Sequence, residues 1–233
     1  MTKRDLEEFE RGLLKHARNG RELFKRTGDR RFRDIAIAAV SRRCGPCMAC
    51  CEVMAVHELE KPGNQRCVHQ GAAGCSIYPN HPSSCAVFSC SWRAGFLAES
   101  DRPDLLGGFI VAMVEAEVAA LRTPPGFSRW ADVARVGAQL LRDRPDFDVL
   151  VVTPIFRQGD PVLGAGNVSD LVRLVALWEA VMPAVEDGRL EAHNVREGIV
   201  APFRRGLDPT HGMAFLTGVA RGVRAQEAGN SPG

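Results

Sequence analysis

The segment CGPCMACC, residues 44–51, places four cysteines within eight positions. The chain has 233 residues, and all eight of its cysteines fall in one stretch, at Cys44, Cys47, Cys50, Cys51, Cys67, Cys75, Cys85 and Cys90. Cysteines used only as small core residues would be scattered along the chain rather than gathered in this way. Four interpretations are open for this stretch: a disulfide framework, a redox pair, a set of metal ligands, or buried thiols.

The composition and the apolar runs indicate where the protein is located and which partners to expect. Thirty Lys and Arg against 28 Asp and Glu give a net charge of +2, which provides no support for a polyanionic partner such as nucleic acid. The charged first 24 residues lack the apolar core and the cleavage site of a secretory signal. The most apolar runs are interrupted by charges, so none reaches the ~20 residues of a membrane span. We therefore expect a cytoplasmic protein without a membrane partner.

Cytosolic thiols are kept reduced, which favours metal binding or catalysis over disulfides. The tetrapeptide Cys44-Gly45-Pro46-Cys47 matches the thioredoxin motif, and a strand could precede it. However, no thioredoxin-like strand and helix pattern follows, and Cys50 and Cys51 would compete in thiol exchange. Metal ligation is therefore favoured over a redox pair and over reduced structural thiols.

The residues around the cysteines favour a metal-stabilised fold. From Arg43 to Trp92 the hydrophobic periodicity disappears, and Gly, Pro, Asn, Ser and Cys dominate. A stretch of ~50 residues without periodicity is unusual inside a compact domain, and cross-linking through a metal would remedy it. The overlapping Cys-x-x-Cys pairs suit zinc, with Zn–S near ~2.3 Å, and are also similar to the cluster-binding run of bacterial ferredoxins. The wider gaps after Cys51 favour an iron–sulfur cluster.

Cys50 and Cys51 are adjacent, which raises a separate question. Neighbouring side chains in an extended segment point in opposite directions, so the two thiols share a metal only if the backbone turns sharply between them. Alternatively they face two sites, since eight thiols would fill two four-thiolate sites. His57, His69 and His81 lie in the same region, but eight thiols make them dispensable as ligands. Outside this region Asp160, Asp170, His193 and His211 are interpreted as structural residues.

The fold class that we predict is α+β, with an irregular cysteine-rich module between N-terminal helices and a small C-terminal α+β portion. The predicted divisions are 1–43, 44–92, 93–226 and a disordered tail, 227–233. Spacing of apolar residues predicts helices over 5–27, 31–44, 128–144, 167–188 and 209–227, and a strand over 147–156. Residues 108–115 and 117–122 fit either a hairpin or one helix, and of the two we favour the hairpin. Ser128 and Ser169 are the predicted N-caps, and Pro183 is expected to kink or end its helix.

The combined motif resembles a known family. CGPCMACC, then Cys67, then GCSIYPNHPSSCAVFSCSW, is similar to the YkgJ-type cysteine-cluster family of zinc- or iron-chelating domains over residues 44 to about 92. The resemblance implies metal ligation by members of the eight-cysteine set and structural roles for Ile77, Tyr78 and Pro82. His81 stands where the family often has Arg. The cysteine motif is also similar to that of a related group, the flagellin lysine methylases. That resemblance implies a cluster used together with S-adenosylmethionine.

Three functional hypotheses follow. The first is a metal-binding protein that holds an iron–sulfur cluster or zinc. The second is an enzyme whose cluster carries out redox or S-adenosylmethionine-dependent chemistry. The third is a zinc module for protein or nucleic-acid contacts, which would need Arg42, Arg43, Arg66 and Arg93 on one face.

Overall fold

The computed structural model describes residues 42, 44–72, 74–77, 80–115, 118–157 and 159–229. The chain divides into two compact units, Met1–Asp104 and Leu105–Gly233, called here the cysteine-rich unit and the sheet unit. Residues 93–104 thus group with the cysteines. Of the helices predicted over 5–27 and 31–44, only Arg42 and Cys44 lie within the described residues. In that part of the chain no helix has the length and apolar character to cross a membrane.

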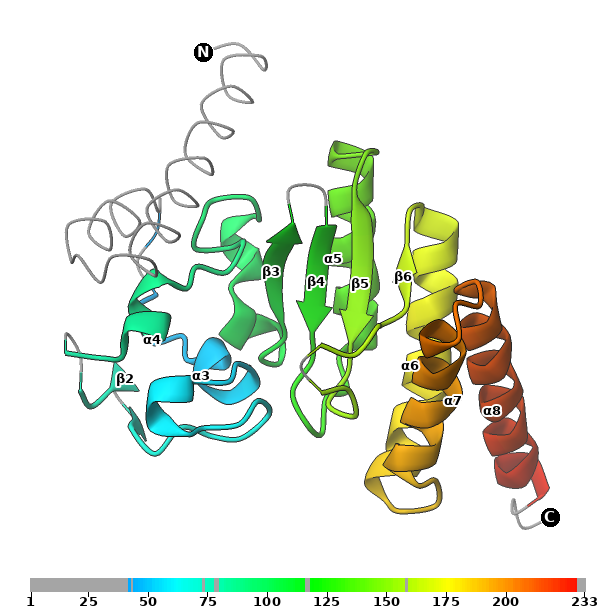
Figure 1. Ribbon diagram of the computed structural model, residues 1–233. Helices are drawn as coiled ribbons and strands as arrows, with labels where there is room; N and C mark the ends of the chain where they lie inside the picture. Colours follow the sequence, from blue (N-terminus) through cyan, green and yellow to red (C-terminus); the bar gives the residue numbers. More distant parts are fainter. Residues whose placement is uncertain are drawn as a thin grey trace. The chain divides into compact units, whose positions relative to one another are not determined.

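The cysteine-rich unit is built from short elements joined by turns (Figure 1). These are α3 (Ala49–Val53), η1 (His57–Leu59), β1 (Gln70–Gly71), β2 (Gly74–Cys75), α4 (Ser83–Val87) and η2 (Glu99–Asp101), while η3 (Pro103–Leu106) crosses the division between the units. Its buried apolar side chains include Val53, Val56 and Trp92. The indole N–H of Trp92 donates to the carbonyl oxygen of Glu99 at 3.2 Å. Among the described residues from Cys44 to Asp104, regular structure and apolar burial are therefore both limited.

The sheet unit contains a mixed four-stranded sheet with the order β3-β4-β5-β6. The strands are β3 (Ile110–Glu115), β4 (Val118–Arg122), β5 (Asp148–Val152) and β6 (Gly164–Ala165). β3 and β4 form an antiparallel hairpin, β5 runs parallel to β4, and β6 is antiparallel to β5. The parallel pair requires a crossover, and helix α5 (Trp130–Asp143) supplies it between β4 and β5.

Four helices complete the sheet unit, namely α5, α6 (Val168–Glu186), α7 (Ala192–Arg204) and α8 (Thr210–Gly229). In Figure 1, α5 lies behind β4 and β5, whereas α7 and α8 lie beyond α6. The close approach of α5 to its neighbours occurs at Gly137, where an added Cβ would lie 2.6 Å from Leu171 Cδ2 and 3.2 Å from Leu121 Cδ2. Trp178 on α6 is fully buried and meets Phe156 edge to face at 5.7 Å between ring centroids.

The mixed helix and sheet architecture confirms the α+β class at that level. The two strands of the predicted hairpin, the helix after Ser128, the strand after Phe147 and the helices near 167–188 and 209–227 are all present. α8 continues to Gly229, further than the apolar pattern indicates. α6 continues through Pro183 to Glu186, so the proline does not end the helix.

Both predicted N-caps are wrong. α5 starts after Arg129, which makes no side-chain cap, and α6 starts after Asn167, whose side chain accepts the N–H of Asp170 at 2.9 Å. Asn is as good a cap as Ser, so the choice between Asn167 and Ser169 depends on where the backbone becomes helical. Helix α7 was not predicted at all, because Gly198 and Pro202 weaken its helical pattern.

Candidate metal centre

Cys44 and Cys47 lie in a tight turn that leads into α3. The N–H of Cys47 donates to the carbonyl oxygen of Cys44 at 3.1 Å, and Gly45 adopts φ +57°, a conformation that favours glycine. The N–H of Cys51 donates to the carbonyl oxygen of Met48 at 2.9 Å. The CGPC segment is therefore a turn before a helix of five residues, which is much shorter than the helix of a thioredoxin-like site.

Arg42 ties the segment that carries Cys90 to the turn of Cys44. Its backbone N–H donates to the carbonyl oxygen of Arg93 at 3.1 Å, and its guanidinium Nη1 donates to that of Trp92 at 3.0 Å. The guanidinium also stacks over the Trp92 ring at 5.2 Å. As a result Cys44 and Cys90 lie close enough for their charges to interact.

A first set of sulfurs gathers around this turn. Cys50 interacts electrostatically with Cys44 and Cys90, and Cys47 interacts with Cys90. Both Cys44 and Cys50 also interact with Cys51, which follows Cys50 in α3. We call these residues the first cysteine set: Cys44, Cys47, Cys50 and Cys90.

A second set forms around the β1–β2 hairpin. The N–H of Cys67 donates to the carbonyl oxygen of Cys51 at 3.1 Å, and the N–H of Gln70 donates to that of Cys67 at 3.1 Å. Gln70 in turn pairs with Cys75 across the two strands. Backbone hydrogen bonds therefore connect Cys51, Cys67 and Cys75 in one chain of contacts.

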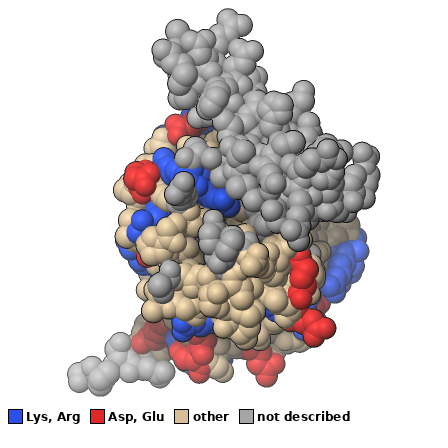
Figure 2. Space-filling view, turned by 90° about the vertical axis from the view of Figure 1, so that its left-hand side faces the viewer, with Lys and Arg blue, Asp and Glu red and all other residues tan. Residues whose placement is uncertain are grey.

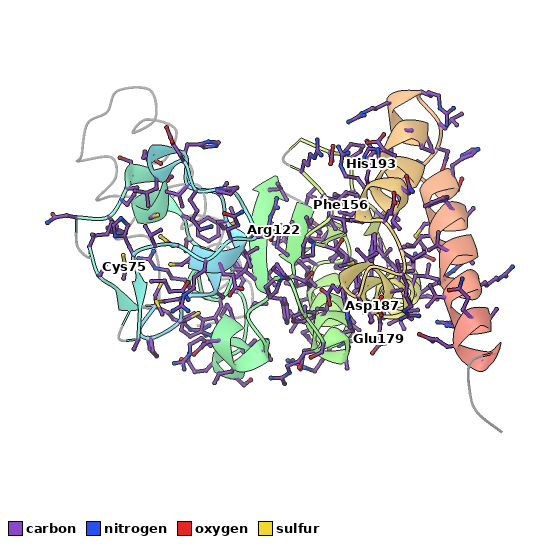
Figure 3. The ribbon with its side chains drawn as sticks, turned by 90° about the horizontal axis from the view of Figure 1, so that it is seen from below. Cys75, Arg122, Phe156, Glu179, Asp187 and His193 are labelled. Carbon is purple, nitrogen blue, oxygen red and sulfur yellow. The ribbon has the colours of Figure 1, made fainter. Side chains whose placement is uncertain are left out.

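Cys85 reaches the second set through Glu58. The carboxylate of Glu58 accepts the N–H of Ser84 at 2.9 Å and its hydroxyl at 2.6 Å, which fastens the first turn of α4 to η1. Cys85 follows Ser84, and its thiol interacts electrostatically with those of Cys51, Cys67 and Cys75. The second cysteine set comprises Cys51, Cys67, Cys75 and Cys85. Figure 3 shows sulfur atoms gathered in the part of the unit that contains Cys75.

The thiols differ in their acidity. Burial raises the pKa of Cys47 to about 11 and that of Cys85 to about 11, and it also raises the pKa of Cys44. Donating a hydrogen bond to Cys51 raises the pKa of Cys50 well above its usual value, and accepting it lowers the pKa of Cys51 to about 7. A thiol-exchange site needs a lowered pKa, so raised values in both CGPC cysteines argue against the redox interpretation.

Backbone N–H groups point at two sulfurs of the first set. Cys47 accepts hydrogen bonds from the N–H groups of Ala49 and Asp104, and Cys90 accepts them from those of Arg93 and Trp92. Each bond lowers the pKa of the thiol that accepts it. Such N–H to sulfur bonds stabilise thiolate over thiol and orient it as a ligand.

A buried cation lies beside the second set. Lys61 is only 8% exposed, and its Nζ donates to the carbonyl oxygens of Glu52, Met54 and Pro62 at 3.3, 2.5 and 3.0 Å. It thereby satisfies carbonyls at the end of α3. The charge of this ammonium interacts with the thiols of the second set, most strongly with Cys67. The roles of Lys61 and Glu58 could not be predicted from the sequence, because they depend on contacts made in the folded chain.

The side chains do not form a closed coordination shell. In the described residues no three Cys, His, Asp or Glu side chains are placed so that they could hold one metal ion. The eight cysteines, all of them described, are free thiols. The fit to zinc or to an iron–sulfur cluster therefore rests on the donors themselves, soft thiolates beside N–H groups and cations.

The other candidate residues have structural surroundings. His57 is exposed in η1, and His193 is exposed on α7 (Figure 3). Asp160 accepts two hydrogen bonds from the buried guanidinium of Arg196, at 2.6 and 2.7 Å. This ion pair explains Asp160 as a structural residue, as its position near a turn predicts.

Two of the four arginines that a nucleic-acid interface would need bond to carbonyl oxygens of their own unit. The guanidinium of Arg42 donates hydrogen bonds to carbonyl oxygens of the same unit, and that of Arg93 donates to the carbonyl oxygen of Phe88 at 3.2 Å. Arg43 lies outside the described residues. On the face shown in Figure 2, the tan residues, which are neither Lys, Arg, Asp nor Glu, cover most of the surface that is not grey. The blue Lys and Arg lie near red Asp and Glu. The described arginines thus give no support to a nucleic-acid interface.

Comparison with models of known protein families, with curated proteins and with solved structures gives no match to this chain.

Proposed function

We propose that the chain is a metal-binding protein whose cysteine-rich module, residues 44–92, holds an iron–sulfur cluster or zinc through its thiolates. One observation carries the proposal: eight cysteines from one stretch lie in one compact unit, as free thiols, with N–H donors and a buried ammonium beside them. N–H donors and a nearby cation stabilise the thiolate form, which is the form that binds metal, whereas a neutral buried thiol gains little from them.

The bound metal would supply cross-links between short elements that bury little apolar surface. The helices α3 and α4 have five residues each, and the strands β1 and β2 have two each. Helices and hairpins of this size are too short to be stable in isolation. The free energy of metal binding would then be part of the free energy of folding. We therefore expect the metal-free module to lose its hydrogen-exchange protection.

Two further points belong to the proposal. Eight reduced thiols suit a reducing compartment, so we place the protein in the cytoplasm. The similarity of the motif to the YkgJ-type chelating family supports the same function.

Metal and sulfide analysis of the anaerobically purified full chain, with an absorption spectrum, tests this function. A brown protein with acid-labile sulfide indicates an iron–sulfur cluster, and a colourless protein with stoichiometric zinc indicates a zinc site. Protein that contains neither metal, while residues 44–92 keep full hydrogen-exchange protection, would rule the proposal out.

A further inference from the structure

The backbone holds the first cysteine set together independently of the second. Cys44 and Cys47 share one turn, closed by a hydrogen bond of 3.1 Å. Arg42 fastens that turn to the segment after Cys90 through the carbonyl oxygens of Arg93 and Trp92. None of these contacts involves β1, β2 or α4.

The second set has its own framework. Cys67 is hydrogen-bonded to the backbone of Cys51 and leads into the hairpin whose second strand ends at Cys75. The α4 helix, which carries Cys85, is fastened by the two hydrogen bonds between Ser84 and Glu58. These contacts in turn do not use Arg42 or the turn of Cys44.

The two frameworks meet at α3. Successive residues of a helix project about 100° apart, so Cys50 and Cys51 start from different sides of α3, although their sulfurs are joined by a hydrogen bond. Ala49 and Val53 are both buried, which fixes the rotation of the helix about its axis. Cys50 has Cys44 and Cys90 as neighbours, whereas the backbone of Cys51 pairs with Cys67.

From this arrangement we infer that the module holds two separate four-thiolate metal sites, divided between the adjacent residues Cys50 and Cys51. The first cysteine set makes one site and the second makes the other. The inference rests on the proposed function, because it assigns the same thiols to individual metal centres.

The charges near the two sets match this division. Four thiolates around one divalent ion carry a net charge of −2, which a nearby cation offsets. The charge of Arg93 interacts with Cys44 and Cys90 of the first set. That of Lys61 interacts most strongly with Cys67 and Cys51 of the second. Lys61 also interacts, more weakly, with Cys50, which adjoins the second set in α3.

Substitution of one cysteine from each set separates the sites. The anaerobically purified full chain, Cys90→Ser, Cys85→Ser and the double variant are compared for metal and sulfide per chain. Each single variant should retain half of the metal, and the double variant none. The controls are Ser89→Ala, next to Cys90, and Ser83→Ala, in the helix α4 that carries Cys85; both should retain all of the metal. Loss of all the metal, or of none, in either single variant would overturn the division.

A second measurement needs no variant. The metal-loaded wild-type chain is treated with increasing chelator, alkylated, and its cysteine-containing peptides are quantified by mass spectrometry. The thiols should become labelled in two groups of four that match the two sets. Simultaneous labelling of all eight, or groups that mix the sets, would contradict two sites while leaving metal binding intact. A wild-type chain without metal would refute the proposed function as well.

Discussion

Cys50 donates a hydrogen bond from its thiol to the sulfur of Cys51, the next residue along α3. The bond places one proton between two sulfurs that belong to different cysteine sets. If both sulfurs ligate metal, that proton must leave, because the ligand form of cysteine is the thiolate. Metal loading should therefore release protons from the very position where the two frameworks meet.

The buried Lys61 is expected to support metal binding at the second set. Lys61→Met keeps much of the side-chain volume and removes the charge. Loss of a partner that supports a ligand typically weakens metal affinity about 10–100-fold, and we expect this for half of the bound metal. Arg173→Met is the control, since Arg173 is exposed on α6 of the sheet unit. Chelator titration measures the effect; equal affinity in Lys61→Met and wild type would exclude this role.

The ion pair of Asp160 and Arg196 should make the stability of the sheet unit sensitive to acid. The hydrogen bonds from Arg196 hold the pKa of Asp160 below its ordinary value. A folded pKa below the unfolded value of about 3.9 contributes stability above that pH, and the contribution is lost as the pH falls through the folded pKa.

Asp160→Asn should therefore lower the melting temperature at pH 7 and show a smaller further loss between pH 5 and pH 3 than wild type. Asp143→Asn is the control, because Asp143 is an exposed carboxylate that accepts a hydrogen bond from Gln139. Thermal unfolding at several pH values measures both. Parallel pH profiles for Asp160→Asn and wild type would show that the pair does not contribute.

Gly137→Ala should destabilise the sheet unit. Its Cβ would approach Leu171 Cδ2 to 2.6 Å, and overpacking of this kind costs about 1–3 kcal/mol, more than the gain of about 1 kcal/mol in helix propensity. Gly222→Ala on α8 meets no atom within 4 Å, so it should stabilise by about 0.4–1 kcal/mol. Urea unfolding of both variants tests the packing; a stabilising Gly137→Ala would show that α5 and α6 are further apart.

Thr153→Val should stabilise the same unit. The Thr153 hydroxyl is buried and lacks a hydrogen-bond partner in the described chain, and such a group costs about 1–3 kcal/mol. Replacing the hydroxyl with a methyl group should recover about 1 kcal/mol. Thr217→Val is the opposite case, because its hydroxyl donates to Met213 at 2.7 Å, and it should give no gain. Urea unfolding distinguishes them, and equal changes in both would contradict this explanation.

Sequence patterns predicted the sheet unit better than the cysteine-rich unit for a physical reason. Strand β5 and helix α5 each bury a continuous apolar pattern against their neighbours, and that pattern is local. Helix α7 has a weaker pattern, with Val195, Ile199 and Val200 buried, and depends on its packing against α8. A pattern within one segment contains no information about its packing against a distant helix.

The cysteine positions were visible in the sequence, but their division into sets was not. It depends on contacts between distant residues, such as Arg42 with Trp92 and Glu58 with Ser84. The spacing of Cys67, Cys75 and Cys85 does not show which thiols these contacts bring together. Whether Cys50 and Cys51 would bind one metal or two is therefore a question that the sequence raises and that only the contacts in the fold address.

X-ray absorption spectroscopy at the metal edge of the anaerobically purified full chain tests the central claim most directly. The account predicts a first shell of sulfur atoms, at about 2.3 Å if the metal is zinc. A first shell of nitrogen and oxygen atoms, with all eight thiols open to alkylation in the same sample, would contradict it.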